Sequence, residues 1–251
     1  MPYLIPTAVE TMYTTKRIIA VVLCAALALS LTACFPSRSD DDAQRVADWI
    51  AEQDYVLGAV GTSESTYDTI LEVMVDVDPQ ISDDDLAHLS KVATRHAEGA
   101  GWPQVIMWYR LGDDRGFSSL GGEATFEIFL GIRYDKDYIK AYARLGGETA
   151  GFSVSLAEGD PESLLSEVNH LVELAAAAGG VQENLEFTAS TEDERFTVTG
   201  EYTVSPAASV KLWQSIAANV QLDKGRAWVV ESVGELAPLY LLDLYVADEE
   251  K

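Results

Sequence analysis

The stretch FSVSLAEGDPESLLSEVNHLVELAAAAGGVQENLEFTA, residues 152–189, contains the unit from which the fold is predicted. Phe152, Val154 and Leu156 alternate with polar residues, which is typical of a half-buried strand. A helix should begin at Asp160-Pro161. Aspartate at this position accepts hydrogen bonds from free amide groups, and proline at the first helical position has no amide to leave unpaired. The stretch therefore starts as a strand that runs into a capped helix.

The second half of the same stretch completes the unit. Apolar residues at helical spacing form one stripe, namely Leu164, Leu165, Val168, Leu171 and Val172. Gly179-Gly180 should end the helix, because glycine readily adopts the backbone conformation that terminates helices. Leu185, Phe187 and Ala189 then alternate again. The predicted unit is strand, helix, strand.

The same theme occurs twice more along the chain. An alternating strand at 67–77 is followed by a helix capped by Ser82 and by a strand at 105–110. Another strand at 196–204 is followed by a helix starting at Ser205-Pro206 and by a strand near 226–233. The copies share their pattern but no extended identity, so the repetition is a hypothesis drawn from the pattern alone.

Further elements are predicted outside these three copies. Apolar spacing at 43–51 predicts a short first helix. Phe126, Ile128, Leu130 and Ile132 alternate and predict a strand, as does the segment 239–246.

The predicted fold class is α+β. Several strands carry polar residues on one face, as at Thr197, Thr199 and Glu201, which is typical of an antiparallel sheet with solvent on one side. We expect a two-layer sandwich, mainly antiparallel, with about three helices on one face and repeated ββαβ, ferredoxin-like, units. Residues 43–251 form either one acidic domain or small subunits at about 43–134, 135–192 and 193–251.

The N-terminal segment has the parts of an export signal. Lys16 and Arg17 precede an uncharged apolar run, Ile18–Leu31. That order is typical of a secretory signal. The run is too short for a membrane-spanning helix, which needs about 20 apolar residues. The residues before Met12 have no signal features, so either Met1 or Met12 could start the protein.

The end of the run, Leu31-Thr32-Ala33-Cys34, resembles the lipobox of bacterial lipoproteins. The resemblance implies cleavage after Ala33, removal of residues 1–33 and a diacylglyceryl lipid on Cys34. It also implies a location on the extracytoplasmic face of the cell membrane, with residues 34–42 as a tether. The alternative is an ordinary secretory signal with an incidental cysteine. Cys24 lies in the removed part, so Cys34 would remain without an internal disulfide partner.

The charge of the chain restricts its partners. The formal net charge is −24, and removal of Lys16, Arg17 and Glu10 makes the body slightly more negative still. Nucleic acid is excluded as a partner, because binding to phosphates depends on lysine and arginine. The charge serves solubility or, alternatively, recognition of a cationic partner. The lipid is the predicted contact with the membrane.

No catalytic, cofactor or metal motif is found. His88 and His96 are eight residues apart, which is not the spacing that brings two imidazoles together on one helix face. The acidic stretch 76–85 begins like a calcium loop, but Ile81 replaces the required glycine and Ala87 the final glutamate. The serines lack the G-x-S-x-G motif. We therefore predict no enzyme, no cofactor besides the covalent lipid and no metal.

Two features remain as candidates for recognition. The segment 111–123, LGDDRGFSSLGGE, is predicted as a long polar loop in which Arg115 and Phe117 could anchor an interface; the alternative is a solvated loop without function. The aromatic residues Trp102, Trp108, Tyr109, Trp213 and Trp228 are expected in the core, with a sugar-binding platform as the alternative.

The functional hypothesis that follows is a membrane-anchored lipoprotein serving as a non-enzymatic interaction module, with an envelope protein or cell-wall component as partner. The first alternative is a lipoprotein that binds a small or cationic ligand. The second is an envelope hydrolase with a dispersed active site.

Overall fold

The computed structural model describes residues 40–65, 69–120, 122–144, 151–179, 185–230 and 237–246. The predicted export signal, Cys34 and most of the tether lie outside these residues. Residues from Ser39 onward group into one compact unit. The account below concerns that unit alone.

The described part of the unit is built from one helix followed by two strands, five times in succession. The helices begin at residues 40, 83, 122, 161 and 207, so the motif recurs about every 40 residues, within the range typical of structural repeats. The elements are α2 (Asp40–Ala51), β1 (Val56–Ser65), β2 (Thr69–Val77), α3 (Asp83–Gly99), β3 (Gln104–Leu111), β4 (Arg115–Ser118), α4 (Gly122–Arg133), β5 (Tyr138–Arg144), β6 (Gly151–Leu156), α5 (Pro161–Ala177), β7 (Glu186–Thr191), β8 (Phe196–Glu201), α6 (Ala207–Ala217), β9 (Leu222–Val230) and β10 (Leu239–Val246).

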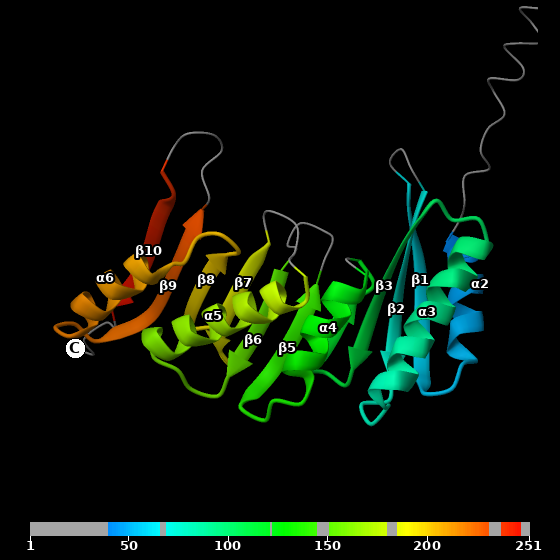
Figure 1. Ribbon diagram of the computed structural model, residues 1–251, viewed down its shortest axis with the longest axis horizontal. Coiled ribbons are helices and arrows are strands. Elements are labelled where there is room, and N and C mark those ends of the chain that lie inside the picture. The colour runs from blue at the N-terminus through cyan, green and yellow to red at the C-terminus, as the bar shows by residue number, and fades with distance from the viewer. Residues whose placement is uncertain are drawn as a thin grey trace, which may run out of the picture. The chain divides into compact units, whose positions relative to one another are not determined.

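The strands form a single ten-stranded sheet in chain order, β1 to β10 (Figure 1). The two strands of each hairpin are antiparallel, whereas strands joined through a helix are parallel. The sheet is therefore mixed, with five antiparallel and four parallel pairs, so the expectation of a mainly antiparallel sheet is met only in part. Strand–helix–strand units return the chain in the same direction, so placing the second strand beside the first makes the pair parallel.

The helices pack on one face of this sheet, as Figure 1 shows for α3 to α6. Inward side chains of neighbouring strands form the core beneath them. Phe117 of β4 stacks on Tyr109 of β3 at 4.8 Å and on Phe129 of α4 at 4.9 Å between ring centroids. Further along, Phe152 stacks on Phe187 at 5.5 Å. One continuous core thus joins successive repeats, as the predicted two-layer α+β class requires.

Three predicted strand–helix–strand units are confirmed, as β2-α3-β3, β6-α5-β7 and β8-α6-β9. Ser82 caps α3 by accepting a hydrogen bond from the amide of Asp85, and Asp160 caps α5 in the same way. The third cap differs, because Pro206 and not Ser205 precedes α6, without a side-chain hydrogen bond. The strand predicted at 239–246 is also present, as β10.

The segment 126–132 is a helix, α4, and the strand predicted there is wrong. Its residues are apolar on a helical stripe as well as in alternation, since Thr125, Ile128, Phe129 and Ile132 are all buried. Short apolar runs satisfy both periods, and tertiary packing decided between them. Strands β1, β4 and β5 were not predicted from the sequence.

Two boundaries also change. Residues 40–42, predicted as the end of the tether, form the first turn of α2. The sheet runs without a break past residues 134 and 192, where subunit limits were considered: residue 134 follows α4, and residue 192 lies in the β7–β8 turn. All ten strands, from β1 to β10, therefore share one sheet.

Candidate functional site

A single row of residues crosses all ten strands on the face opposite the helices. Strand register places its members side by side; they are Gly58, Asp76, Arg110, Gly116, Tyr142, Ser153, Thr188, Thr199, Trp228 and Leu241. Successive side chains point to opposite faces of a sheet, and the neighbours of these residues, such as Val75 and Ala141, lie in the core. We call this side, which no described helix covers, the open face.

Hydroxyl side chains occupy the middle of the open face. Strands β6 to β8 present six of them, which we call the hydroxyl patch: Ser153, Ser155, Thr188, Ser190, Thr197 and Thr199. The Oγ atoms of Ser155 and Ser190 lie 3.0 Å apart, and the Oγ1 atoms of Thr188 and Thr199 lie 3.1 Å apart. The hydroxyls thus bond across strands, which supports the sheet on the side opposite the described helices.

An aromatic and a basic residue flank the hydroxyl patch on each side. Tyr142 and Lys140 come from β5, next to Ser153 and Ser155 in register. Trp228 and Arg226 come from β9, next to Thr199 and Thr197. The guanidinium carbon of Arg226 lies 5.0 Å from the centre of the Trp228 ring, which is within range of a cation–π interaction.

A cavity of about 370 Å³ lies on the open face at β2 to β5. We call it the Trp108 pocket; among the residues around it are Met74, Trp108, Arg110, Asp113, Gly116 and Tyr142. Trp108 and Tyr142 are half-buried, so their rings retain accessible surface. The pocket therefore combines aromatic walls with charged groups, as small-ligand sites do.

Glycine at position 116 is required by its surroundings. A Cβ atom there would lie 2.7 Å from the carbonyl oxygen of Tyr109 and 3.4 Å from the ring of Tyr142. The Tyr142 hydroxyl donates to the carbonyl of Asp113 at 2.8 Å, which fixes the ring beside the glycine. The absence of a side chain at 116 keeps the pocket open between β3 and β5.

Arg110 and Asp76 form a two-point ion pair at the rim of the pocket. Nε of Arg110 lies 2.5 Å from Oδ1 of Asp76, and Nη2 lies 2.8 Å from Oδ2. The hydrogen bond to Asp76 raises the pKa of Arg110 above its ordinary value. Both side chains remain about half exposed. The pair therefore holds its geometry while still facing solvent.

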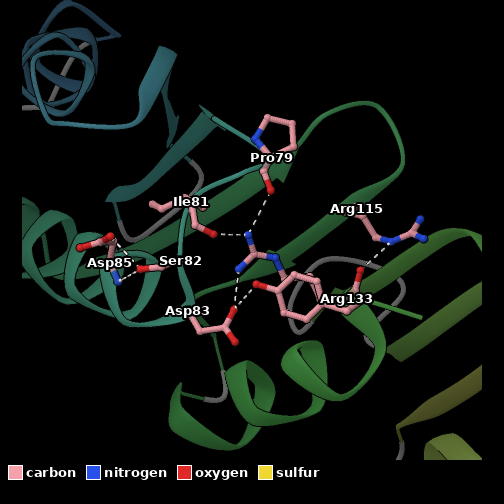
Figure 2. Close-up of polar contacts among 8 residues, drawn as sticks. Pro79, Ile81, Ser82, Asp83, Asp85, Arg115 and Arg133 are labelled. Carbon is pink, nitrogen blue, oxygen red and sulfur yellow. Dashed lines mark hydrogen bonds and ion pairs between the residues drawn. The ribbon is translucent and has the colours of Figure 1, made fainter. Parts of the chain in front are cut away.

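Arg115 and Phe117, the predicted interaction residues, lie elsewhere. The segment 111–123 is not a long loop, because it contains β4 and the start of α4. Phe117 is 3 % exposed in the core. Arg115 donates to several backbone carbonyls, among them Arg133 at 3.2 Å (Figure 2) and Ile139 at 2.8 Å. Both side chains are thus committed to internal contacts.

The acidic segment considered for calcium also has internal partners. Asp83 accepts from Nη1 of Arg133 at 2.7 Å, and Arg133 also donates to the carbonyls of Pro79 and Ile81 (Figure 2). Asp76 binds Arg110 as described. Within the described residues, no group of three or more histidine, cysteine, aspartate or glutamate side chains is placed to hold a metal.

The five aromatic residues divide between the two faces. Trp102, Tyr109 and Trp213 are buried as predicted. Trp108 and Trp228 are half-buried on the open face, so the expectation of core packing is wrong for these two. The signal was available in the sequence: Trp108 lies between Met107 and Tyr109, and alternation gives it the opposite direction from both.

Exposed apolar side chains gather on the end strands of the sheet. β1 contributes Leu57 and Val60, and β10 contributes Leu239, Tyr245 and Val246, each more than half exposed. Tyr240 of β10 is 45 % exposed but pairs with Val229, an inward residue, so it lies on the helix side. These strands form the two edges of the sheet, and no other strand of the described residues lies beside their outer backbone groups.

Comparisons with known protein families, with curated proteins and with solved structures found no match for this chain. Among the described helices, none is long and apolar enough to cross a membrane.

Proposed function

We propose that the chain is a lipid-anchored, non-enzymatic binding module of the cell envelope, held by Cys34 on the extracytoplasmic face of the membrane. Its binding surface is the open face of the sheet. The lipobox resemblance supports the anchor, and the open face supports the binding role. The partner is an extended component of the envelope, either a protein or a cell-wall polymer.

The observation that carries the proposal is the position of Trp108 and Trp228. Both are half-buried on a face that no described helix covers; Trp228 lies in the row beside Thr199, and Trp108 lies two residues before Arg110 on β3. Large aromatic side chains dominate binding energy where they are found at interfaces, and polar neighbours supply hydrogen bonds. The opposite face is occupied by the helices and the core.

The Trp108 pocket favours a second candidate, the binding of a small ligand. Its aromatic walls and its ion pair converge on one cavity, unlike the hydroxyl patch. The two candidates share the open face, so one set of variants tests both.

The test is a pull-down from native membranes and from purified cell-wall material, using the full-length lipidated chain. Trp108→Ala and Trp228→Ala remove the proposed anchors. Tyr240→Ala is the matched control, because it removes an exposed aromatic ring from the helix side of the sheet. Cys34→Ala controls for recruitment by the lipid alone.

We expect partners or cell-wall material to be retained by wild type and by Tyr240→Ala, and to be lost by both tryptophan variants. Equal retention by Trp108→Ala, Trp228→Ala and wild type would overturn the open face as the binding surface. Loss with Tyr240→Ala alone would place the interface on the helix side or at the β10 edge.

A further inference from the structure

The Trp108 pocket has the width of one ring. Tyr142 on β5 and Trp108 on β3 lie on either side of β4, and strands two places apart are separated by about 10 Å. On β4 between them, Ser118 pairs with Trp108, and Gly116 lies under the edge of the Tyr142 ring. Aromatic faces hold contact atoms at about 3.5–4.0 Å. The remaining space suits one ring-sized group between the two aromatic side chains.

The polar groups of the pocket both donate and accept hydrogen bonds. Arg110, which lines the pocket, uses Nε and one Nη2 hydrogen on Asp76 and has three further N–H hydrogens. The carboxylate of Asp76 keeps further lone pairs, and Asp113 adds another carboxylate. Adjacent donors and acceptors match adjacent hydroxyl groups, because each hydroxyl can donate and accept at once.

The charge of the pocket excludes strongly charged ligands. Its guanidinium is already neutralised by Asp76, and Asp113 is acidic, so a phosphate or carboxylate finds no unpaired cation there. The chain as a whole repels anions, with a net charge of −24. A cationic ligand would find only the carboxylate of Asp113 beyond this neutralised pair. The ligand that fits is neutral, ring-shaped and rich in hydroxyl groups.

The hydroxyl patch continues from the pocket along the same row. Tyr142 is followed by Ser153, Thr188 and Thr199 before Trp228 is reached. Four strand spacings separate β5 from β9, a span of about 19 Å. Thr199 is buried, so a chain of linked rings leaving the pocket would pass over the half-buried Ser153 and Thr188 and end against a second aromatic ring.

From these observations we infer that the Trp108 pocket binds one neutral hexopyranose unit of an extended glycan, whose following units lie over the hydroxyl patch toward Trp228. The apolar C–H face of the sugar ring stacks on Trp108 and Tyr142, and its neighbouring hydroxyls bond to the Arg110–Asp76 pair. This inference rests on the proposed function and names its ligand class.

The test is isothermal titration of the full body, residues 34–251, with defined neutral β-linked hexaoses, namely cellohexaose and chitohexaose, and with the matching disaccharides. We expect at least one hexaose to bind, and to bind more tightly than its disaccharide. Trp108→Ala and Tyr142→Ala should weaken binding by at least tenfold, the scale of losing an aromatic anchor. Trp228→Ala should weaken the hexaose but leave the disaccharide unchanged, and Tyr240→Ala should change neither.

If a variant fails to fold, NMR on the wild type gives an independent test. The indole N–H signal of Trp108 should shift on addition of the hexaose. Absence of binding by both hexaoses, or binding without effect of Trp108→Ala and without a shift of that signal, would overturn the inference. If partner capture still depends on Trp108 and Trp228 while neither hexaose binds, the open face remains a binding surface and only the glycan assignment fails.

Discussion

Nη1 of Arg133 lies 2.7 Å from Oδ1 of Asp83, an ion pair that joins the end of α4 to the first turn of α3 (Figure 2). The Arg133 side chain is 3 % exposed and also donates to the carbonyls of Pro79 and Ile81. Arg133, in the third repeat, thus pairs with the polar groups of the turn that leads into α3, the helix of the second repeat. Because stacked repeats contact mainly their neighbours, such links decide how cooperatively they unfold.

Replacing Arg133 with methionine should destabilise the fold by about 2–4 kcal/mol, because two carbonyls and a carboxylate lose their buried donor. Equilibrium urea unfolding followed by circular dichroism measures the change. Arg45→Met, which breaks a pair of exposed side chains with Asp42, is the control and should cost less than about 1 kcal/mol. Equal effects of the two variants would contradict the assigned role of Arg133.

Gly225→Ala should destabilise the C-terminal repeat. A Cβ at this position would lie 2.4 Å from a ring carbon of Trp213, which is 1 % exposed. Overpacking of this kind costs about 1–3 kcal/mol. The matched control is Gly58→Ala, where no atom lies within 4 Å and we expect a change within about 0.5 kcal/mol. Thermal unfolding of both variants distinguishes the outcomes.

The buried hydroxyl pair on the open face should show coupling. Ser155→Ala leaves the hydroxyl of Ser190 without its partner at 3.0 Å, and should cost about 1 kcal/mol. The double variant Ser155→Ala/Ser190→Ala should cost less than the sum of the single variants, since no hydroxyl is left unpaired. Additive losses in a double-mutant cycle would mean that the two groups do not interact.

Alkaline conditions should destabilise the protein through its buried tyrosines. Burial raises the pKa of Tyr109 above the ordinary value of 10.0. The folded state therefore holds the phenol proton after the unfolded state has released it. The corresponding stability is intact below about pH 10 and is lost as the pH rises further, by about 1.4 kcal/mol per pH unit for each such group.

Tyr109→Phe should reduce this loss of stability at alkaline pH by the contribution of one tyrosine. The substitution is mild at neutral pH, because the contact of the Tyr109 hydroxyl to the carbonyl of Ser90 is long, at 3.5 Å. Tyr245→Phe, at an exposed position of β10, controls for the removal of a phenol. Urea unfolding of the three proteins between pH 8 and pH 11 is the measurement, and parallel curves for all three would refute the assignment.

The lipid anchor predicts a covalent label. Metabolic labelling with a palmitate analogue should mark the wild type and leave Cys34→Ser unlabelled. The control for expression is Cys24→Ser, whose cysteine lies in the segment expected to be removed. Equal labelling of wild type and Cys34→Ser would show that Cys34 is not the attachment site.

Much of the fold could be predicted from local sequence patterns. The caps at Ser82 and Asp160 and the three strand–helix–strand units could be identified because each depends on residues close together in the chain. The segment 126–132 could not be assigned, because its apolar residues suit both a helix and a strand. Arg115 and Phe117 were placed in a loop for a similar reason: four residues of β4 are too few to show a period.

The open face was harder to see in advance. Alternation gave the direction of Trp108 relative to Met107 and Tyr109, yet it could not show that β5 would lie two strands away with Tyr142 beside Gly116. That juxtaposition depends on register between strands joined through a helix, and register is set by packing across the sheet. The pocket therefore became visible only in three dimensions.

The sequence by itself determined the acidic charge, the helix caps and the strand–helix–strand periodicity, and it predicts the export signal with its lipobox, because each of these depends on neighbouring residues. The tertiary structure alone decided that ten strands join in chain order and that Arg133 reaches Asp83, 50 residues away. It also decided that aromatic, hydroxyl and charged side chains share one row. These relationships arise from long-range pairing, in which the core on one face fixes the register and thereby positions the side chains on the other.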